Sequence, residues 1–586
     1  MKKLVLYCST IFLSFSGSAQ YYLRGDVKDE QNRPIQNAKI LLHSAKMLYN
    51  TGVQGSFGII VREIYDSLTC SMDGYEAKTL KVKTDIWQSI VLKVSATYAT
   101  KNKQKLISIT KDLKQTSKYN WFVNDETYFQ LVENQFVHSS QYPNTGFSLN
   151  VNKASYSNVR RFLNSNSAVP PDAVRVEEMV NYFNLHYTKP ALNETFHIST
   201  QLSASPWNDK EQLLFVNISA KKLDLHNIPP GNFVFLIDVS GSMDMPNRLP
   251  LLKAAFQSFV KNLRAIDTMS IVMYGGTVGV WLQPTSGAEK EKIGKSIEEL
   301  TASGDTPGES AIRAAYKVAE STFIKGGNNR IILATDGDFN VGETSEKALD
   351  ELITKMRQTG VYLTCLGVGM GNFKDSKLQT LAKKGNGNYA YLDDIHEAEK
   401  VLVHELTQTF YAVADDALMN IQFNPAMVKE YRLVGFDNKR EAIADQSNDL
   451  EGGEIGSGNS TLAIFEIVPT PQNESNNTGG MNESIAQLQL KFSSCNAADS
   501  LKIEHSVPNN FVAYANIHKD LQFATVVTML ALKLKQSPYI DGVDWITISS
   551  LAQQAANKND YLQNEFLTLL EKAQKIYPEK KKKRKS

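Results

Sequence analysis

Three side chains that carry oxygen atoms follow one apolar segment of the chain. Residues 233–237, FVFLI, have the length and apolar character of a buried strand, and Asp238 comes directly after them. Ser240 and Ser242 follow at alternate positions. Ligands of a parallel α/β sheet bind beyond the carboxyl ends of its strands, so we expect these side chains to line such a crevice. Their carboxylate and hydroxyl oxygens are hard ligands, and they predict a site for Mg²⁺ or a similar cation.

Two further segments offer oxygen ligands later in the chain. A loop at residues 303–308 contains Thr306 and precedes a helical pattern, and a second apolar strand at residues 331–334 is followed by Asp336. Aspartate and serine near Asp238 would also suit a helix cap or a turn, so the first motif alone is weak. The addition of Thr306 and Asp336, each at the end of a suitable element, favours the metal site.

The elements around these residues alternate between strands and helices. The expected strands are residues 233–237, 268–274, 279–282, 330–334, 361–368 and 388–392. Helical spacing of apolar residues occupies positions 249–263, 290–300, 310–323, 346–356 and 396–410. This alternation predicts a doubly wound, Rossmann-like and mainly parallel α/β sheet.

The Asp-x-Ser-x-Ser run, the threonine in a loop and the late Thr-Asp-Gly closely resemble the motifs of von Willebrand factor type A domains. The resemblance implies that the strands ending at Asp238 and Asp336 are neighbours. It also implies bound Mg²⁺, or another divalent cation such as Mn²⁺ or Ca²⁺, and a partner protein that supplies an acidic side chain to the ion. The metal-ion-dependent adhesion site of that family would correspond here to Asp238, Ser240, Ser242, Thr306 and Asp336.

The N-terminus has the pattern of a secretory signal peptide over residues 1–19. Lys2 and Lys3 precede an apolar segment at residues 4–15, and small residues stand before Gln20. That segment is shorter than the roughly 20 residues that span a bilayer. We therefore expect export to the periplasm, the outer envelope or the medium, with no transmembrane segment after signal removal and a possible association with the envelope.

Residues 20–94 read as a small all-β domain, because short alternating segments are separated by turn signals. Their motifs resemble carboxypeptidase regulatory-like domains, and the resemblance implies a seven-stranded, transthyretin-like β-sandwich without peptidase activity. Residues 95–133 are read as a linker that begins with a polar stretch. The motifs are Gly25-x-Val27-x-Asp29, Pro34-Ile35-x-x-Ala38-x-Ile40, Gly55-x-Phe57, Asp66-Ser67-Leu68 and Gly74-Tyr75.

Flanking regions at 134–230 and 413–576 surround the expected A domain at 231–412, and residues 577–586 form a basic tail. The flanks resemble those around the A domain in a group of exported or envelope bacterial proteins. Their motifs are NVRRFL at 158–163, PPDAVRVEEM at 170–179, AVADD at 412–416, FNP at 423–425, YRLVG at 431–435 and GEIGSG at 453–458.

Both flanks contain expected strands, so we predict that the A domain is inserted in a β-sandwich. Strands are expected at 196–203, 213–219, 419–423, 430–433, 461–467, 485–492 and 502–505, and helices at 155–163, 171–183, 523–534 and 545–575.

Composition and motifs exclude several classes of function. The chain contains 63 Lys and Arg residues and 62 Asp and Glu residues, so its formal net charge is +1. This nearly neutral charge does not indicate nucleic-acid binding. The chain lacks a GxSxG elbow and an HExxH motif. We therefore predict a non-enzymatic protein that binds or assembles with another protein through a divalent cation. Two alternatives stay open: an envelope scaffold that the metal only stabilises, and a metal-assisted hydrolase.

Overall fold

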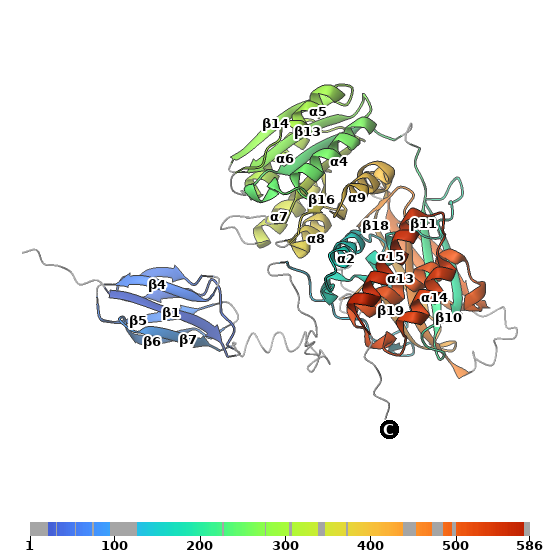
Figure 1. The fold of residues 1–586 in the computed structure, drawn as a ribbon, viewed down its shortest axis with the longest axis horizontal. Coiled ribbons are helices and arrows are strands. Elements are labelled where there is room, and N and C mark those ends of the chain that lie inside the picture. The colour runs from blue at the N-terminus through green and yellow to red at the C-terminus, as the bar shows by residue number, and fades with distance from the viewer. Residues whose placement is uncertain are drawn as a thin grey trace, which may run out of the picture. The chain divides into compact units, whose positions relative to one another are not determined.

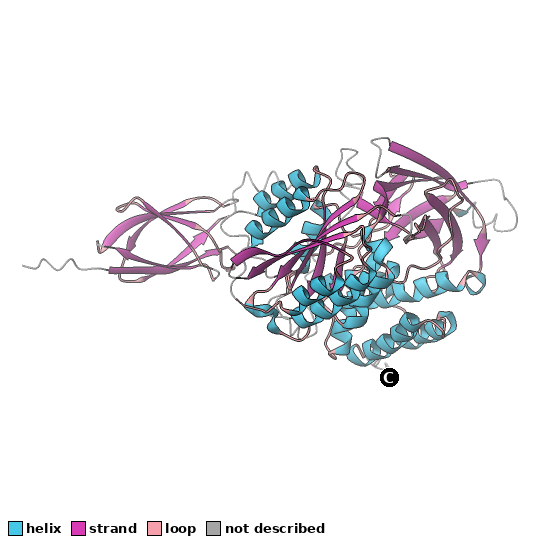
Figure 2. Ribbon diagram, turned by 90° about the horizontal axis from the view of Figure 1, so that it is seen from above, coloured by secondary structure: helices cyan, strands magenta, loops and turns pink. Residues whose placement is uncertain are grey.

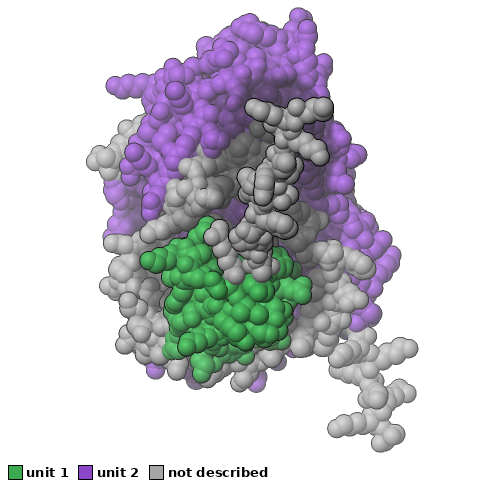
Figure 3. All heavy atoms as spheres, turned by 90° about the vertical axis from the view of Figure 1, so that its left-hand side faces the viewer, with its two compact units in different colours: residues 1–117 green, residues 118–586 purple. Residues whose placement is uncertain are grey.

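The computed structural model describes residues 21–93 and 126–578, which form parts of two compact units, 1–117 and 118–586 (Figure 3). Within those ranges it leaves out residues 31, 53, 62, 73–74, 225–227, 276, 304–307, 338–345, 371–372, 438–452, 472–483 and 495–499. The predicted signal peptide, most of the predicted linker, Thr306 and most of the basic tail lie outside the described residues. None of the described helices is long and apolar enough to cross a membrane.

The described part of the first unit contains seven strands in two sheets, ordered β4-β1-β7 and β3-β2-β5-β6. Alternate residues of these strands are buried in one core, for example Phe57, Ile59 and Val61 of β4. The strands are β1 (Tyr21–Asp29), β2 (Lys39–Leu42), β3 (Met47–Asn50), β4 (Ser56–Val61), β5 (Tyr65–Ser71), β6 (Lys78–Lys83) and β7 (Trp87–Leu92).

The second unit contains an α/β sheet, drawn in green to yellow in Figure 1. Its strand order is β14-β13-β12-β15-β16-β17. All neighbouring strands are parallel except β13 and β14, and β12 lies beside β15 as predicted. The strands are β12 (Gly231–Asp238), β13 (Thr268–Gly275), β14 (Thr277–Ser286), β15 (Asn328–Thr335), β16 (Tyr362–Val368) and β17 (Tyr389–Leu392).

Helices cover both faces of this sheet because its strands are apolar on both sides (Figure 2). Phe235 and Ile237 of β12 pack in the core on the side of α4, whereas Val234 and Leu236 pack on the side of α6. The helices are α4 (Leu249–Asn262), α5 (Lys290–Glu298), α6 (Gly308–Ser321), α7 (Glu346–Arg357), α8 (Asp375–Lys384), α9 (Ile395–Glu399) and α10 (Leu406–Phe410).

Strands on either side of the α/β sheet in sequence pair with one another. The order β24-β10-β11-β21-β19-β8 joins strands that precede residue 231 to strands that follow residue 410. A second sheet contains β20-β18-β22-β23, with β9 paired to β18, and both sheets contribute to one core. The strands are β8 (Val137–His138), β9 (Asn144–Ser148), β10 (Phe196–Ala204), β11 (Gln212–Ala220), β18 (Ala412–Phe423), β19 (Val428–Val434), β20 (Gly453–Gly456), β21 (Ser460–Pro469), β22 (Ser484–Ser493), β23 (Ser500–Pro508) and β24 (Phe511–Val512).

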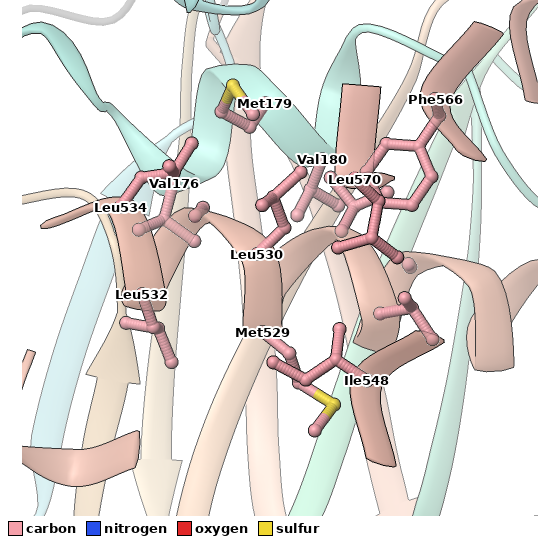
Figure 4. Close-up of a cluster of buried hydrophobic side chains, with 14 of the residues drawn as sticks. Val176, Met179, Val180, Met529, Leu530, Leu532, Leu534, Ile548, Phe566 and Leu570 are labelled. Atoms are coloured by element: carbon pink, nitrogen blue, oxygen red, sulfur yellow. The ribbon is translucent and has the colours of Figure 1, made fainter. Parts of the chain in front are cut away.

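A layer of helices packs against the first of these two sheets. Its centre is α13, which is buried along almost its whole length and packs its side chains against α3, α14 and α15 (Figure 4). A helix that is apolar on every side requires neighbours all round, which explains why these helices gather there. The helices are α2 (Ala154–Asn164), α3 (Val176–Asn181), α13 (Lys519–Lys535), α14 (Trp545–Ala555) and α15 (Tyr561–Ile576).

Three expected helices are interrupted in the structure. The helix predicted at 171–183 is a 3₁₀ turn followed by α3, because the N–H of Arg175 donates to Ser155 Oγ (2.9 Å) instead of a helical carbonyl. The helix predicted at 545–575 is divided into α14 and α15, and Asp560 caps the second by accepting from the N–H of Gln563. The third, at 396–410, contains a π-helical turn between α9 and α10.

Buried ion pairs connect the α/β sheet and its helices to both flanks. Arg160 of α2, with 2% of its side chain exposed, donates to Asp393 at 2.5 Å and Glu397 at 2.7 Å, beside and within α9, and to Glu565 of α15 at 3.0 Å. A charge removed from water is tolerated only when it is paired and hydrogen-bonded. Arg160 therefore holds three segments, distant in sequence, in one arrangement.

We predict that Arg160→Met lowers the free energy of unfolding by about 3–5 kcal/mol, because it leaves the buried carboxylates of Asp393 and Glu397 without their cation. Urea-induced unfolding of the full chain measures the loss. Lys295→Met is the matched control, since its pair with Glu299 is exposed and should change stability by less than about 0.5 kcal/mol. Equal stability of the two variants would contradict the assigned role of Arg160.

Candidate metal site

Asp238 ends β12 and is fully buried, with both of its carboxylate oxygens oriented by hydrogen bonds. The backbone N–H of Ser240 donates to Oδ1 at 2.9 Å, and the hydroxyl of Thr335 donates to Oδ2 at 2.9 Å. Thr335 is the last residue of β15, and its hydroxyl oxygen accepts from the N–H of Gly337 at 3.0 Å. The carboxylate is thus positioned by its own loop and by the neighbouring strand.

Ser240 and Ser242 follow in the loop and bring their hydroxyl groups together. The two Oγ atoms are 3.1 Å apart, Ser240 is buried, and Ser242 is exposed. An octahedral Mg²⁺ with ligands at about 2.1 Å places adjacent ligand oxygens about 3.0 Å apart. The two hydroxyls, which are hydrogen-bonded to each other, are thus separated by close to one edge of such a coordination shell, and Ser242 faces solvent.

Asp336 follows β15 and is buried at the same edge of the sheet as Asp238. Arg248, directly before α4, donates from Nη1 to Asp336 Oδ2 at 2.6 Å. The same Nη1 donates to the carbonyl of Ser242 at 2.7 Å, and Nη2 donates to the carbonyl of Met370 at 3.1 Å. Arg248 therefore connects the carboxylate of one strand to the serine loop of the other.

Sequence reasoning did not find Arg248 or the role of the Thr335 hydroxyl. Arg248 and Asp336 are 88 residues apart, and no local spacing distinguishes this arginine from a surface residue. Thr335 could have been suspected, because it ends an apolar strand directly before a predicted ligand.

Burial dominates the electrostatics of the site. Loss of hydration raises the pKa of Asp238 to about 6, the hydrogen bonds from Ser240 and Thr335 oppose this rise, and the nearby charge of Asp336 adds to it. An ionised Asp238 is therefore unfavourable in the protein alone. A bound cation would offset that cost, so the donor set of two buried carboxylates and two hydroxyls fits a hard divalent ion.

Of the five predicted ligands, the structure describes Asp238, Ser240, Ser242 and Asp336 and brings them to one edge of the sheet. Thr306 is not among the described residues. The N–H of Ser303, at the start of its loop, donates to the carbonyl of Val239 at 2.6 Å, and α6 begins at Gly308.

Comparisons with known proteins match three consecutive parts of the second unit, and the middle match covers the α/β sheet. Residues 232–405 match the family model of the von Willebrand factor type A domain, and residues 122–215 match one described as von Willebrand factor. Residues 408–576 match the model of the C-terminal region of the uncharacterized protein YfbK.

The chain is also similar to individual proteins. The uncharacterized protein YfbK of Escherichia coli (strain K12) is 36% identical over 469 residues, which are 76% of this chain and 80% of that protein. Inter-alpha-trypsin inhibitor heavy chain H2 of Sus scrofa is 28% identical over 203 residues, 33% of this chain and 21% of that protein. A solved von Willebrand factor type A structure from Catenulispora acidiphila has a TM-score of 0.40 and 15% identity, and covers 64% of this chain and 89% of its own.

We predict that Asp238→Asn stabilises the metal-free protein at pH 7.5 and leaves its stability unchanged near pH 4. The folded-state pKa of about 6 lies above the ordinary value of 3.8, so the folded protein binds the proton more tightly and stability falls as pH rises between these values. One pKa unit corresponds to about 1.4 kcal/mol, so the full penalty is about 3 kcal/mol.

Urea unfolding in chelator at both pH values measures this effect. Asp244→Asn is the matched control, because Asp244 is an exposed carboxylate of the same loop. A loss of stability in Asp238→Asn at pH 7.5 would show that the buried charge is not unfavourable.

Proposed function

Because the chain belongs to the family of the uncharacterized protein YfbK and contains a von Willebrand factor type A domain, we propose that it binds or assembles with another protein through a divalent cation. The proposed activity is non-enzymatic. The proposed ion is Mg²⁺ or another divalent cation such as Mn²⁺ or Ca²⁺. Its ligands would be Asp238, Ser240, Ser242, Thr306 and Asp336.

One observation carries this proposal: two buried carboxylates end neighbouring parallel strands, beside two serine hydroxyls 3.1 Å apart. Carboxylate and hydroxyl oxygens gathered in this way are the hard ligands that a small divalent cation prefers. Asp238 and Asp336 would hold the ion directly or through water.

The partner would present a carboxylate to the ion. Ser242 is exposed whereas Asp238 and Ser240 are buried, so an incoming ligand would approach from the side of Ser242. Mg²⁺ often keeps several waters in its shell, and an acidic side chain of a partner can replace one of them. The exposed loop residues around the ion would then determine which partner fits.

The proposal includes the finer organisation of the chain. Residues 20–94 would be a transthyretin-like, carboxypeptidase regulatory-like sandwich, which the two sheets around one core support. The type A domain would be inserted in a second sandwich, which the pairing of β11 with β21 supports. A signal peptide at 1–19 would direct the protein to the periplasm, the outer envelope or the medium.

We expect the full chain to bind Mn²⁺, a paramagnetic substitute for Mg²⁺, at a site that requires Asp238. Titration followed by electron paramagnetic resonance should show at least a ~10-fold weaker affinity in Asp238→Ala, because a charged ligand is lost. The exposed Asp244→Ala should bind as the wild type does. Equal affinity of all three proteins would refute a metal site at the end of β12.

Partner binding is tested by capturing proteins from envelope extracts on the tagged chain, without crosslinking, and identifying them by mass spectrometry. We expect one set of proteins to be retained with Mg²⁺ and lost both with chelator and with Asp238→Ala. Retention in all three conditions would reject the metal-dependent mechanism. A scaffold would instead show lower thermal stability in Thr306→Ala with unchanged capture, and a hydrolase would show turnover that disappears in Asp336→Ala.

A further inference from the structure

Two histidines and an aspartate lie close together in the second unit, away from the candidate metal site at the end of β12. They come from two segments that are far apart in sequence. His186 lies beyond α3, and His518 and Asp520 lie at the start of α13. One potential ligand atom from each of the three residues lies within 4.8 Å of the others. We propose that His186, His518 and Asp520 form a second metal site, for Zn²⁺ or a related transition-metal ion, with water as the fourth ligand.

The spacing of these side chains fits tetrahedral coordination. His518 Nδ1 and Asp520 Oδ2 are 3.5 Å apart, and the same Nδ1 accepts a hydrogen bond from the N–H of Asp520 at 3.2 Å, which a metal ion at Nδ1 would replace. Zinc takes imidazole nitrogen and carboxylate oxygen at about 2.0–2.2 Å, so two such ligands at the tetrahedral angle lie about 3.4 Å apart. The rings of His186 and His518 have centroids 4.9 Å apart and are inclined by 58°, so they do not stack face to face. The three potential ligand atoms lie within 4.8 Å of one another, so the side chains would have to move closer together to share one ion.

The backbone holds His186 in place for this role. Its N–H donates to Asp520 Oδ2 at 3.1 Å, and its carbonyl accepts from Asn217 Nδ2 at 2.9 Å. Its φ of 55° is left-handed, a conformation that glycine, asparagine, aspartate and histidine adopt more readily than other residues do. These two contacts fix the backbone that carries the imidazole, so little conformational entropy would be lost when a metal binds.

The three side chains are accessible to solvent. The side chain of His518 is 59% exposed and that of Asp520 is 35% exposed, so solvent reaches the cluster. The positive end of the α13 helix dipole opposes a cation at this position. The carboxylate of Asp520, in the first turn of that helix, offsets this effect.

Ligand chemistry separates this cluster from the site at the end of β12. Imidazole nitrogen favours zinc, copper and nickel, whereas carboxylate and hydroxyl oxygens favour magnesium and calcium. A metal held by His186 and His518 would also connect the N-terminal flank to α13, so it would stabilise the folded state by mass action.

The test is calorimetric titration of the full chain, stripped of metal, with Zn²⁺ in the presence of excess Mg²⁺. His186→Asn keeps a residue that tolerates positive φ, and His518→Asn keeps a residue that can cap α13. We expect one Zn²⁺ site in the wild type and at least ~10-fold weaker binding in each variant. His404→Asn, at an exposed histidine, should bind as the wild type does.

A second measurement guards against misfolded variants. Thermal unfolding without metal should give the same midpoint for the wild type and both variants, and Zn²⁺ should raise the midpoint of the wild type alone. Asp238→Asn should retain the Zn²⁺ site, which separates this inference from the proposed function. Unchanged Zn²⁺ affinity in His186→Asn and His518→Asn, or loss of the site in Asp238→Asn, would overturn the proposal.

Discussion

The pairing of β12 with β15 forces two carboxylates out of water at the same edge of a parallel sheet. Asp238 and Asp336 come at or directly after the ends of these strands, and parallel neighbours necessarily end on the same side. The structure compensates the two charges differently, because hydrogen bonds from Ser240 and Thr335 reach the first and the guanidinium of Arg248 reaches the second. A divalent ion would compensate the remaining charge that burial makes unfavourable.

Contacts of this site and contacts of the N-terminal flank reach described residues that lie close together in sequence. Arg248 donates to the carbonyl of Met370, and the hydroxyl of Tyr391 donates to the carbonyl of the adjacent Gly369. At the first residue of α8, the carboxylate of Asp375 pairs with the buried Arg175 of the N-terminal flank at 2.8 Å. Residues 369 and 370, beside the strand-end site, and residue 375, which pairs with a flank, all follow β16 closely in sequence.

Buried ion pairs join segments that sequence separates. Arg330 of β15 pairs with Glu454 of β20, and Arg160 of α2 reaches both α9 and α15. Such pairs contribute little net stability compared with apolar packing, because desolvation opposes their attraction. Their consequence is specificity: a wrong arrangement of the domain and its flanks would leave a charge buried without a partner.

Local patterns in the sequence determined most strands of the α/β sheet and the residue types at their ends. A strand that is buried on both faces is a continuous apolar run. A ligand at the end of the strand follows this run directly, so a few neighbouring residues predict both the strand and the ligand, as at 233–238. The same reasoning placed α4 and α5 by their helical spacing.

Only the tertiary structure decided which distant groups meet. The pairing of Arg248 with Asp336, the meeting of His186 with His518, and the break before α3 at Arg175 each depend on partners supplied by another segment. Hydrogen bonds and ion pairs act over a few ångströms in space, and periodicity along the chain carries no information about separations of tens to hundreds of residues. The motif could therefore be predicted from the sequence, whereas the contacts that orient it required the fold.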